Sequence, residues 1–487
     1  MNQSLALLTD LYQLTMAYGY WKANVADRQS VFHLYFRKHP FGGGFSVACG
    51  LEDALKYLED FRFDESDVEY LATLQGNDHE PLFERGFLDY LRDLRFDCDV
   101  WAMPEGTVAF PGEPLLRVSG PIIPCQLVET ALLNILNFQT LIATKAARIC
   151  LASRGEDVLE FGARRAQGPD GALTASRAAY IGGCAATSNV LAGKTFGIPV
   201  KGTHAHSWVM LFDSEIEAFK TYARAMPNNC VFLVDTYDTL EGVRHAAQIG
   251  QWLKGEGHRM AGIRLDSGDL AYLSIQARRI LDDAGLQDAA IVASNDLDET
   301  TIGSLKEQGA RINVWGVGTR LVTGHDQPAM GGVYKLAAVR EGTGEWQPKI
   351  KLSEQAVKVS NPGIQQVRRY RVAHEYSSDV IYDVATDLSN GCTMIDPFDA
   401  TRQKKISAET PFVDLLVPVF RDGRRIDDSP SIHQTRAHVQ EELNGFYSGI
   451  KRFINPHVYP VGLEESLHSL KTDLIRQARR IPLVAPK

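Results

Sequence analysis

Several features that would decide the function of a protein quickly are missing from this sequence. Its seven cysteines are scattered without a CxxC pair or a regular framework, and their number is odd. This pattern excludes a disulfide scaffold and a cysteine zinc site, and it is typical of reduced thiols in the cytoplasm. No stretch approaches the roughly 20 apolar residues that span a bilayer, and no basic region precedes a long apolar core at the N-terminus. The sequence therefore predicts a cytoplasmic protein with no membrane partner.

A basic excess is also lacking. The net charge is -9 and the pI is about 5.8, which argues against a protein that coats nucleic acid. Hydrophobic residues make up 44% and charged residues 23% of the 487 residues, the balance of a globular protein with two or three domains. The three glycines within Arg37–Phe45 can cradle an anion or form a flexible turn, but their spacing matches no P-loop.

The middle of the chain has the rhythm of alternating strands and helices. Strand-like runs recur at spacings of about 25 to 40 residues, as an α/β barrel requires. They lie at residues 157–161, 199–202, 230–234, 262–265, 290–293 and 312–317. The predicted organisation is a first domain over 1–125, a barrel over 126–330, strands over 331–400 that return to the first domain, and a helical extension over 401–487.

Polar side chains follow each predicted strand. In a barrel these ends share one rim, so residues distant in sequence converge on one pocket. Asp235 and Asp266 can hold Mg²⁺ or ribose hydroxyls, or can cap helices. Arg164 and Arg264 suit an anionic substrate, or pair with the aspartates. The backbone at Gly318-Thr319 can contact a phosphate. Together these residues indicate transfer of a phosphorylated sugar.

Two histidines lie two residues apart in the segment Val200–Trp208, after a predicted strand. Imidazole is well suited to proton or phosphoryl transfer near neutral pH, although both residues can also be ordinary loop histidines. Thr203 lies in the same segment. Tyr12 falls beside the apolar stripe of a helix predicted over residues 4–20, where packing is the simpler interpretation.

As an ordered set, the motifs of this chain closely resemble those of the nicotinate phosphoribosyltransferase family, a group of type II phosphoribosyltransferases. They run from near residue 5 to about residue 475. The motifs are LTDLYQLTM at Leu8–Met16, FRKHPF at Phe36–Phe41, FGARRAQG at Phe161–Gly168, GTHAHS at Gly202–Ser207, RLDSGDL at Arg264–Leu270 and GGVYKL at Gly331–Leu336.

The resemblance implies a fold and a reaction. The fold is an incomplete α/β barrel with an open α/β sandwich, in a homodimer with shared active sites. The reaction makes nicotinate mononucleotide and pyrophosphate from nicotinate and phosphoribosyl pyrophosphate. It is coupled to ATP hydrolysis, uses Mg²⁺ and serves salvage synthesis of NAD. No metal ligand is assigned.

The resemblance also implies roles for individual residues. His206 matches the histidine that the family phosphorylates from ATP, whereas the motif assigns no role to His204. Tyr12, from the neighbouring subunit, stacks on the pyridine ring opposite Phe161. Arg164 or Arg264, with Thr203, holds the carboxylate of nicotinate. Gly318 and Thr319 match a phosphate-contacting site. Asp266 is placed in the catalytic group and Asp235 in the substrate-binding group.

Three other interpretations stay open on the sequence alone. Nicotinamide phosphoribosyltransferase has a similar fold but takes the neutral amide, and this kind of selectivity can rest on a few polar contacts. A barrel aldolase can use Lys201 as a Schiff base. A barrel that only binds partners is the third interpretation, but it leaves the convergent polar rim unexplained.

Overall fold

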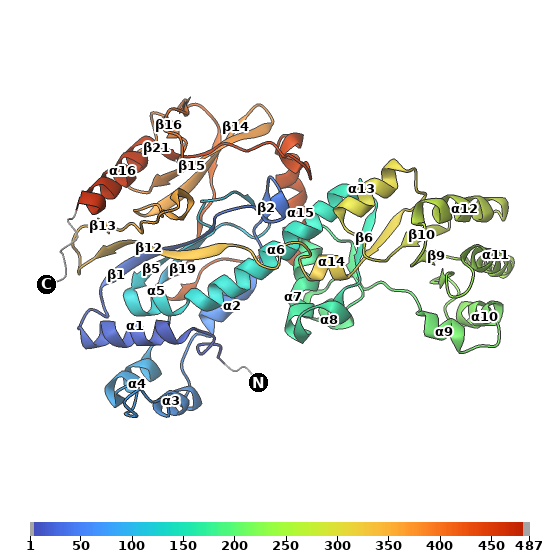
Figure 1. Ribbon diagram of the computed structural model, residues 1–487, viewed down its shortest axis with the longest axis horizontal. Coiled ribbons are helices and arrows are strands. Elements are labelled where there is room, and N and C mark those ends of the chain that lie inside the picture. The colour runs from blue at the N-terminus through green and yellow to red at the C-terminus, as the bar shows by residue number, and fades with distance from the viewer. Residues whose placement is uncertain (1–3, 481–487) are drawn as a thin grey trace. The chain divides into compact units, whose positions relative to one another are not determined.

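The computed structural model describes residues 4–480, and the chain divides into two compact units. Unit 1 contains the residues up to Thr140 and those from Ala329 onward, whereas unit 2 is Leu141–Pro328. In Figure 1 unit 2 runs from the later turns of α6 to just beyond α14.

Unit 2 is built on a parallel sheet with the order β7-β6-β11-β10-β9-β8. Five of the predicted strands are confirmed, with minor changes at their ends. Each has a short run of buried apolar residues, which is typical of parallel strands. The confirmed strands are β6 (Asp157–Glu160), β8 (Val231–Leu233), β9 (Gly262–Leu265), β10 (Ala290–Ala293) and β11 (Val314–Val317). The sixth strand of the sheet, β7 (Ala186–Thr187), was not predicted.

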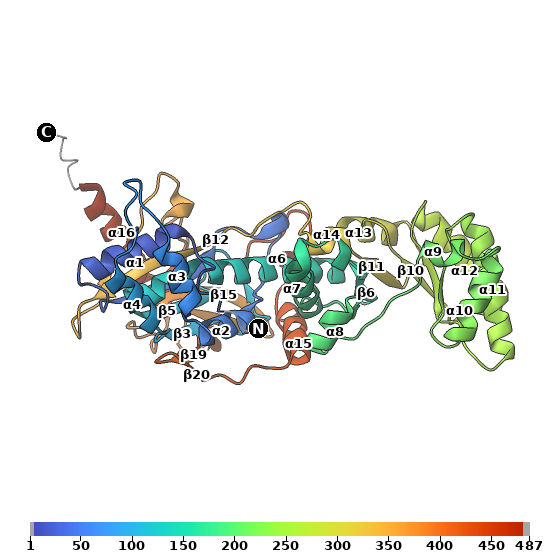
Figure 2. The same cartoon turned by 90° about the horizontal axis from the view of Figure 1, so that it is seen from below.

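Helices join these strands, and several begin at a side-chain cap. Asp238, Asp269 and Asp298 each accept a hydrogen bond from the backbone N–H three residues later. Figure 1 shows α11 and α12 beside β9, and Figure 2 shows α10 next to α11. The unit 2 helices are α7 (Gly168–Ile181), α8 (Val190–Phe196), α9 (His206–Met210), α10 (Glu215–Ala225), α11 (Thr239–Gly255), α12 (Leu270–Asp283), α13 (Glu299–Glu307) and α14 (Thr319–Val322), with the 3-10 turn η2 (Ala163–Arg165).

The strand predicted at residues 199–202 is wrong. Only Val200 forms an isolated bridge there, to Thr187, and the two-residue strand β7 occupies the edge instead. Lys201 N–H donates to Thr187 O at 3.0 Å, and Leu233 N–H donates to His204 Nε2 at 3.2 Å. The segment between these contacts therefore spans the two edges of the curled sheet as an irregular loop, which leaves its side chains free for a site.

Unit 1 contains an antiparallel sheet with the order β13-β12-β1-β5-β3-β19-β20. After unit 2 the chain returns to this sheet, where β12 pairs with β1. The strands are β1 (Gln29–Phe36), β3 (Asp99–Ala102), β5 (Leu116–Pro121), β12 (Gly332–Arg340), β13 (Gln347–Pro348), β19 (Val417–Arg421) and β20 (Arg424–Arg425). A separate pair joins β2 (Ser46–Val47) and β4 (Val108–Ala109).

A further six-stranded sheet of unit 1 has the order β17-β16-β21-β15-β14-β18. Its strands are β14 (Gln365–Val372), β15 (Glu375–Asp383), β16 (Cys392–Ile395), β17 (Gln403–Ile406), β18 (Phe412–Asp414) and β21 (Val461–Glu464). The extension at 401–487, predicted to be helical, carries α15 (Ile432–Asn444) and α16 (Glu465–Arg480) and also β17 to β21. These strands are two to five residues long, too short to give a clear alternation of apolar and polar residues.

The remaining helices of unit 1 are α1 (Leu11–Lys22), α2 (Leu51–Glu59), α3 (Glu65–Ala72), α4 (Arg85–Asp93) and α5 (Ile122–Leu127). The helix predicted from residue 4 begins only after Asp10, because residues 5–9 form turns. Helix α6 (Glu129–Ser153) follows α5 closely. The stretch Ile122–Ser153 has the length and composition of a membrane-spanning helix, but 61% of its most apolar window is buried inside the protein.

Candidate active site

The carboxyl-terminal edge of the unit 2 sheet carries a repeated arrangement of aspartates. Each of the pairs Asp235/Asp238 and Asp266/Asp269 has one carboxylate just after a strand and a second three residues later. The later aspartate caps the following helix in both cases. Capping therefore does not account for Asp235 and Asp266, and both remain available to the edge of the sheet.

Arg264, on β9, organises this edge. Its guanidinium donates to Ser294 Oγ at 2.8 Å, to Thr203 Oγ1 at 3.0 Å and to Asp266 Oδ1 at 2.8 Å. Its carbon Cζ lies 5.8 Å from the centre of the Phe161 ring, so the charge is close to an aromatic face. These contacts bring together four residues that the sequence predicted for the site. Ser294, which also donates to Asp266 Oδ1, was not predicted from the sequence.

Hydrogen bonds hold the two carboxylates in place. Burial alone would raise the pKa of Asp266, but the hydrogen bond from Ser294 and the charge of Arg264 outweigh it, and the pKa is lowered. Asp235 Oδ2 accepts from the backbone N–H of Asp266 at 3.0 Å and from Ser267 Oγ at 2.6 Å. The side chain of Asp235 is 1% exposed, and its Oδ1 has no hydrogen-bond donor among the described residues.

His206, the first residue of α9, faces these carboxylates. Its Nε2 lies 3.9 Å from Asp235 Oδ1 and 3.8 Å from Asp266 Oδ2, and its Nδ1 lies 3.2 Å from Thr236 Oγ1. The side chain is 40% exposed, so both solvent and a ligand can reach it. Thr236 was missed in the sequence, where a threonine after an aspartate carries no distinctive signal.

His204 has a different environment from His206. It is buried against the rings of Tyr222 and Phe219 and accepts the backbone N–H of Leu233. Burial lowers its pKa to about 4, so the ring is neutral near pH 7. The structure thus separates the two histidines into a structural one and one at the polar edge.

Phe161 follows β6 and packs against glycine. A Cβ at Gly316 would lie 2.8 Å from Phe161 Cδ2, so a side chain at this position would displace the ring. Glu160, the residue before Phe161, holds the same turn by hydrogen bonds. It is fully buried and accepts from the backbone N–H of Gly162, from Ser176 Oγ at 2.8 Å and from Thr187 Oγ1 at 2.6 Å.

The segment after β11 presents backbone groups at the same edge of the sheet. Gly318 precedes α14, and Thr319 is exposed at its first position. Arg320 pairs with Asp298 at 2.5 Å, which ties the start of α14 to the cap of α13.

Three other residues named in the sequence analysis lie outside this cluster. Arg164, in η2, is exposed, and no hydrogen bond or ion pair joins it to the rest of the described chain. Tyr12 lies on α1 in unit 1 and is 50% exposed. The Lys201 side chain is 57% exposed and its Nζ lies 3.7 Å from Asp157 Oδ2, at the first residue of β6. The Lys201 amine is thus solvated and paired with a carboxylate, whereas a Schiff-base lysine lies in a desolvated pocket.

Comparison with known proteins identifies related chains over most of this sequence. The family model for the nicotinate phosphoribosyltransferase N-terminal domain matches residues 7–137, the family model for the nicotinate phosphoribosyltransferase family matches 157–358, and that for the C-terminal domain matches 365–471. Nicotinate phosphoribosyltransferase of Bacillus subtilis (strain 168) is 45% identical over 98% of this chain and 96% of its own length.

Solved structures agree with the sequence matches. The crystal structure of human nicotinic acid phosphoribosyltransferase superposes with a TM-score of 0.84 at 34% identity, covering 96% of this chain and 99% of the human chain. A nicotinate-nucleotide pyrophosphorylase from Pyrococcus furiosus has a TM-score of 0.70 at 22% identity over 91% of this chain and 96% of its own, which shows a shared fold.

Proposed function

The chain belongs to the nicotinate phosphoribosyltransferase family, and from this premise we propose how the edge of unit 2 carries out the family reaction. The enzyme forms nicotinate mononucleotide from nicotinate and phosphoribosyl pyrophosphate, a step in NAD salvage. The observation that carries the proposal is the convergence on Arg264 of a hydroxyl, a carboxylate and an aromatic ring.

Arg264 is the proposed ligand of the nicotinate carboxylate. Three of its five N–H groups are used within the protein, so each terminal nitrogen keeps one N–H for a substrate. The pyridine ring stacks on Phe161, and the exposed Arg164 supplies further donors. The Thr203 hydroxyl donates to His204 O at 3.2 Å and would turn from it to bind the carboxylate. A guanidinium clamp of this kind favours the acid over the neutral amide.

The transfer step needs no general base. The pyridine nitrogen of nicotinate carries a lone pair, which attacks the anomeric carbon while the bond to pyrophosphate breaks and its electrons leave with the pyrophosphate. Catalysis then rests on positioning and on stabilising the leaving group. In this proposal Gly318 and Thr319 bind the phosphoribosyl phosphate, Asp235 binds the substrate, and Asp266 takes part in catalysis by holding Arg264.

The two carboxylates fit Mg²⁺. Within residues 4–480 no group of three or more His, Cys, Asp or Glu side chains is arranged to hold a metal ion alone. Mg²⁺ usually binds one or two carboxylates together with substrate phosphates, and Asp235 Oδ1 is a buried acceptor without a donor. Asp235 and Asp266 would therefore hold the ion, which when bound neutralises charge on pyrophosphate.

His206 is the proposed site of coupling to ATP. When Nδ1–H donates to Thr236, the lone pair of Nε2 is free to accept the γ-phosphoryl group as ADP leaves. Phosphohistidine places about two negative charges beside Asp235 and Asp266. Repulsion between the phosphoryl group and the two carboxylates raises the free energy of the phosphorylated enzyme. Hydrolysis of the phosphohistidine can therefore drive substrate binding or product release.

We also propose a cytoplasmic homodimer with shared active sites. Leu8, Leu11 and Met16, near the half-exposed Tyr12, are exposed apolar residues on or beside α1. A second copy that covers them would bring Tyr12 to the ring opposite Phe161. The proposed partners are small-molecule substrates and a second copy of the chain.

Radiolabelling tests the role of His206. We expect label from ATP labelled in its γ-phosphate to appear on the wild-type chain as an acid-labile, base-stable adduct. His206→Ala should carry no label and should keep slow, ATP-independent transfer. His258→Ala is the control, because this histidine lies on the loop before β9. Equal labelling of His206→Ala and the wild type would exclude the assignment.

A further inference from the structure

Unit 1 contains a cavity whose lining includes none of the residues assigned to the proposed reaction. It has a volume of about 680 Å³ and is lined entirely by residues of unit 1. Its walls include the loop after β1, residues 110–112, residues 357–361, the β16–β17 hairpin with residues 396–404, and residues 456–461 at the start of β21. Lys471 of α16 also lines it. Two of the three glycines near Arg37, Gly43 and Gly44, belong to these walls, and a Cβ at Gly44 would lie 2.5 Å from Ile450 O.

Two lysines give the cavity an uncompensated positive charge. Lys471 is 8% exposed, and its Nζ donates to Asn361 Oδ1 at 2.9 Å. Lys404 Nζ donates to Ser378 Oγ at 3.1 Å. Neither lysine pairs with a carboxylate among the described residues, and burial lowers the pKa of both, that of Lys471 to about 8. Lysine is rarely buried without a partner, because desolvation of its charge costs free energy.

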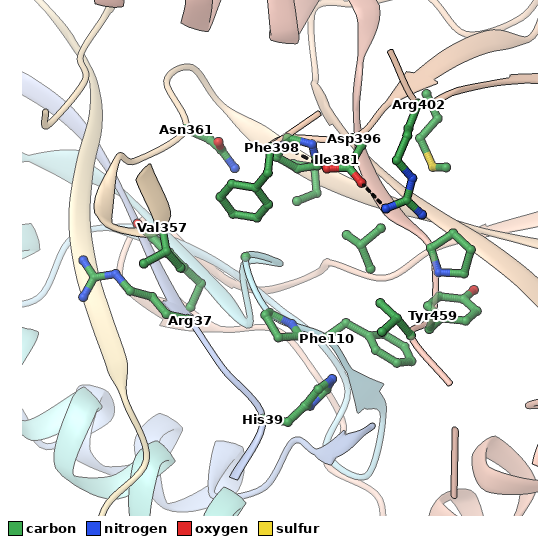
Figure 3. Close-up of a pocket in the computed structure, with 18 of the residues that line it drawn as sticks. Arg37, His39, Phe110, Val357, Asn361, Ile381, Asp396, Phe398, Arg402 and Tyr459 are labelled. Atoms are coloured by element: carbon green, nitrogen blue, oxygen red, sulfur yellow. Dashed lines mark hydrogen bonds and ion pairs between the residues drawn. The ribbon is translucent and has the colours of Figure 1, made fainter. Parts of the chain in front are cut away.

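The acidic side chain in the lining does not relieve this charge. Asp396 pairs with Arg402 at 3.2 Å, as the dashed line in Figure 3 marks. The lysines therefore keep unused N–H donors in a cavity of low polarity, where an anion would gain strong hydrogen bonds.

Aromatic side chains line another part of the cavity. Figure 3 shows the ring of Phe398 directed into the space between Asn361 on one side and Tyr459 on the other. Phe398 is 68% exposed and Val458, also in the lining, is 81% exposed. The deeper rings of Tyr459 and Phe110 stack with centroids 4.3 Å apart. An exposed aromatic ring beside the buried Lys471 and the half-buried Lys404 suits a ligand with a flat face and a charged group.

We propose that this cavity is a second ligand site that binds a nucleotide, with its phosphate on Lys404 and Lys471 and its base against Phe398. The volume is within the range of about 300–1,000 Å³ that is usual for small-molecule sites. Two uncompensated cations match the double negative charge of a phosphate monoester near pH 7. A simple inorganic anion would make no contact with the aromatic rings of the lining, such as Phe398.

Calorimetric titration of the full chain with AMP tests the site. Lys404→Ala and Lys405→Ala form a matched pair, because the second lysine is the exposed neighbour on β17 and does not line the cavity. We expect the Kd for AMP to rise about tenfold or more in Lys404→Ala and in Phe398→Ala. Lys405→Ala and Ile454→Ala, which alters another exposed apolar residue outside the lining, should bind AMP like the wild type.

The catalytic edge and simple anion binding are separated by two further titrations. His206→Ala should bind AMP at the unit 1 cavity as the wild type does, and inorganic phosphate should bind more weakly and be insensitive to Phe398→Ala. The proposal is overturned if the wild type does not bind AMP, if the two lysine variants behave alike, or if His206→Ala abolishes binding.

Photolabelling provides a test that does not depend on variants. After irradiation with 8-azido-AMP, peptide mapping of the wild-type chain should find the label within residues 396–404 or 456–461. Label confined to peptides of unit 2 would contradict the proposal.

Discussion

At the scale of single residues, Arg264 is the centre of the proposed substrate pocket, and its planar fork is the feature a lysine lacks. We expect Arg264→Lys to raise the KM for nicotinate about 10- to 100-fold and to narrow the preference for nicotinate over nicotinamide. Steady-state kinetics with both substrates checks this, with Arg259→Lys, an exposed arginine just before β9, as control. Unchanged selectivity in Arg264→Lys would remove its assigned role.

His204 makes a prediction about stability and pH. Its folded-state pKa of about 4 is below the ordinary value of 6.5, so protonation favours the unfolded chain. Its contribution to stability is therefore complete above pH 6.5 and is lost as the pH falls toward 4. The gap of about 2.5 pKa units corresponds to at most about 3.4 kcal/mol.

The comparison of wild type with His204→Gln isolates this effect. Glutamine can still accept the N–H of Leu233 but does not titrate. Thermal unfolding between pH 4 and 7 should show a smaller loss of stability on acidification in the variant than in the wild type. Parallel pH profiles for the two proteins would show that the ring does not become protonated on unfolding.

At the scale of elements, the pairing of β11 with β6 places Gly316 against the ring of Phe161. Gly316→Ala should displace the ring and raise the KM for nicotinate severalfold, with less effect on the KM for phosphoribosyl pyrophosphate. Gly303→Ala is the control, because a Cβ at this helical position meets nothing within 4 Å. Equal kinetics for the two variants would argue against stacking on Phe161.

A strand of unit 2 could be predicted from the sequence only where its apolar run was long enough and was followed by polar residues. The strands ending at Leu233, Leu265 and Ala293 were predicted, because each is a buried apolar run followed by polar residues. The two residues of β7 carry no such pattern, so β7 was not predicted, and the run before Gly202 was predicted to be a strand instead. After β10, Ser294 makes the contact with Arg264, and the next residue, Asn295, has a positive φ of 95°.

The residues of the candidate site could also be predicted only in part from the sequence. Single-sequence patterns place Asp235, Asp266 and Arg264 at strand ends, and parallel pairing brings them together. They do not distinguish His204 from His206, since only the packing of His204 against Tyr222 reveals which ring is buried. Nor do they show that Asp238 and Asp269 take over helix capping.

At the scale of the whole molecule, shared active sites predict complementation between inactive variants. Tyr12→Ala and His206→Ala should each have little ATP-coupled activity alone. When equal amounts are mixed and allowed to exchange subunits, half of the dimers should be mixed, each with one intact site. About a quarter of wild-type activity should then return. No recovery, despite mixed dimers seen by native mass spectrometry, would mean that Tyr12 acts within its own chain or not at all.

The central claim is that the edge of unit 2 transfers a phosphoribosyl group to nicotinate under the control of ATP. The most direct measurement is formation of pyridine mononucleotide by the purified protein with phosphoribosyl pyrophosphate and Mg²⁺, comparing nicotinate with nicotinamide, each with and without ATP. We expect product from nicotinate, formed faster with ATP. Product from nicotinamide alone would contradict the assigned role of Arg264, and product from nicotinate at the same rate without ATP would contradict the role of His206.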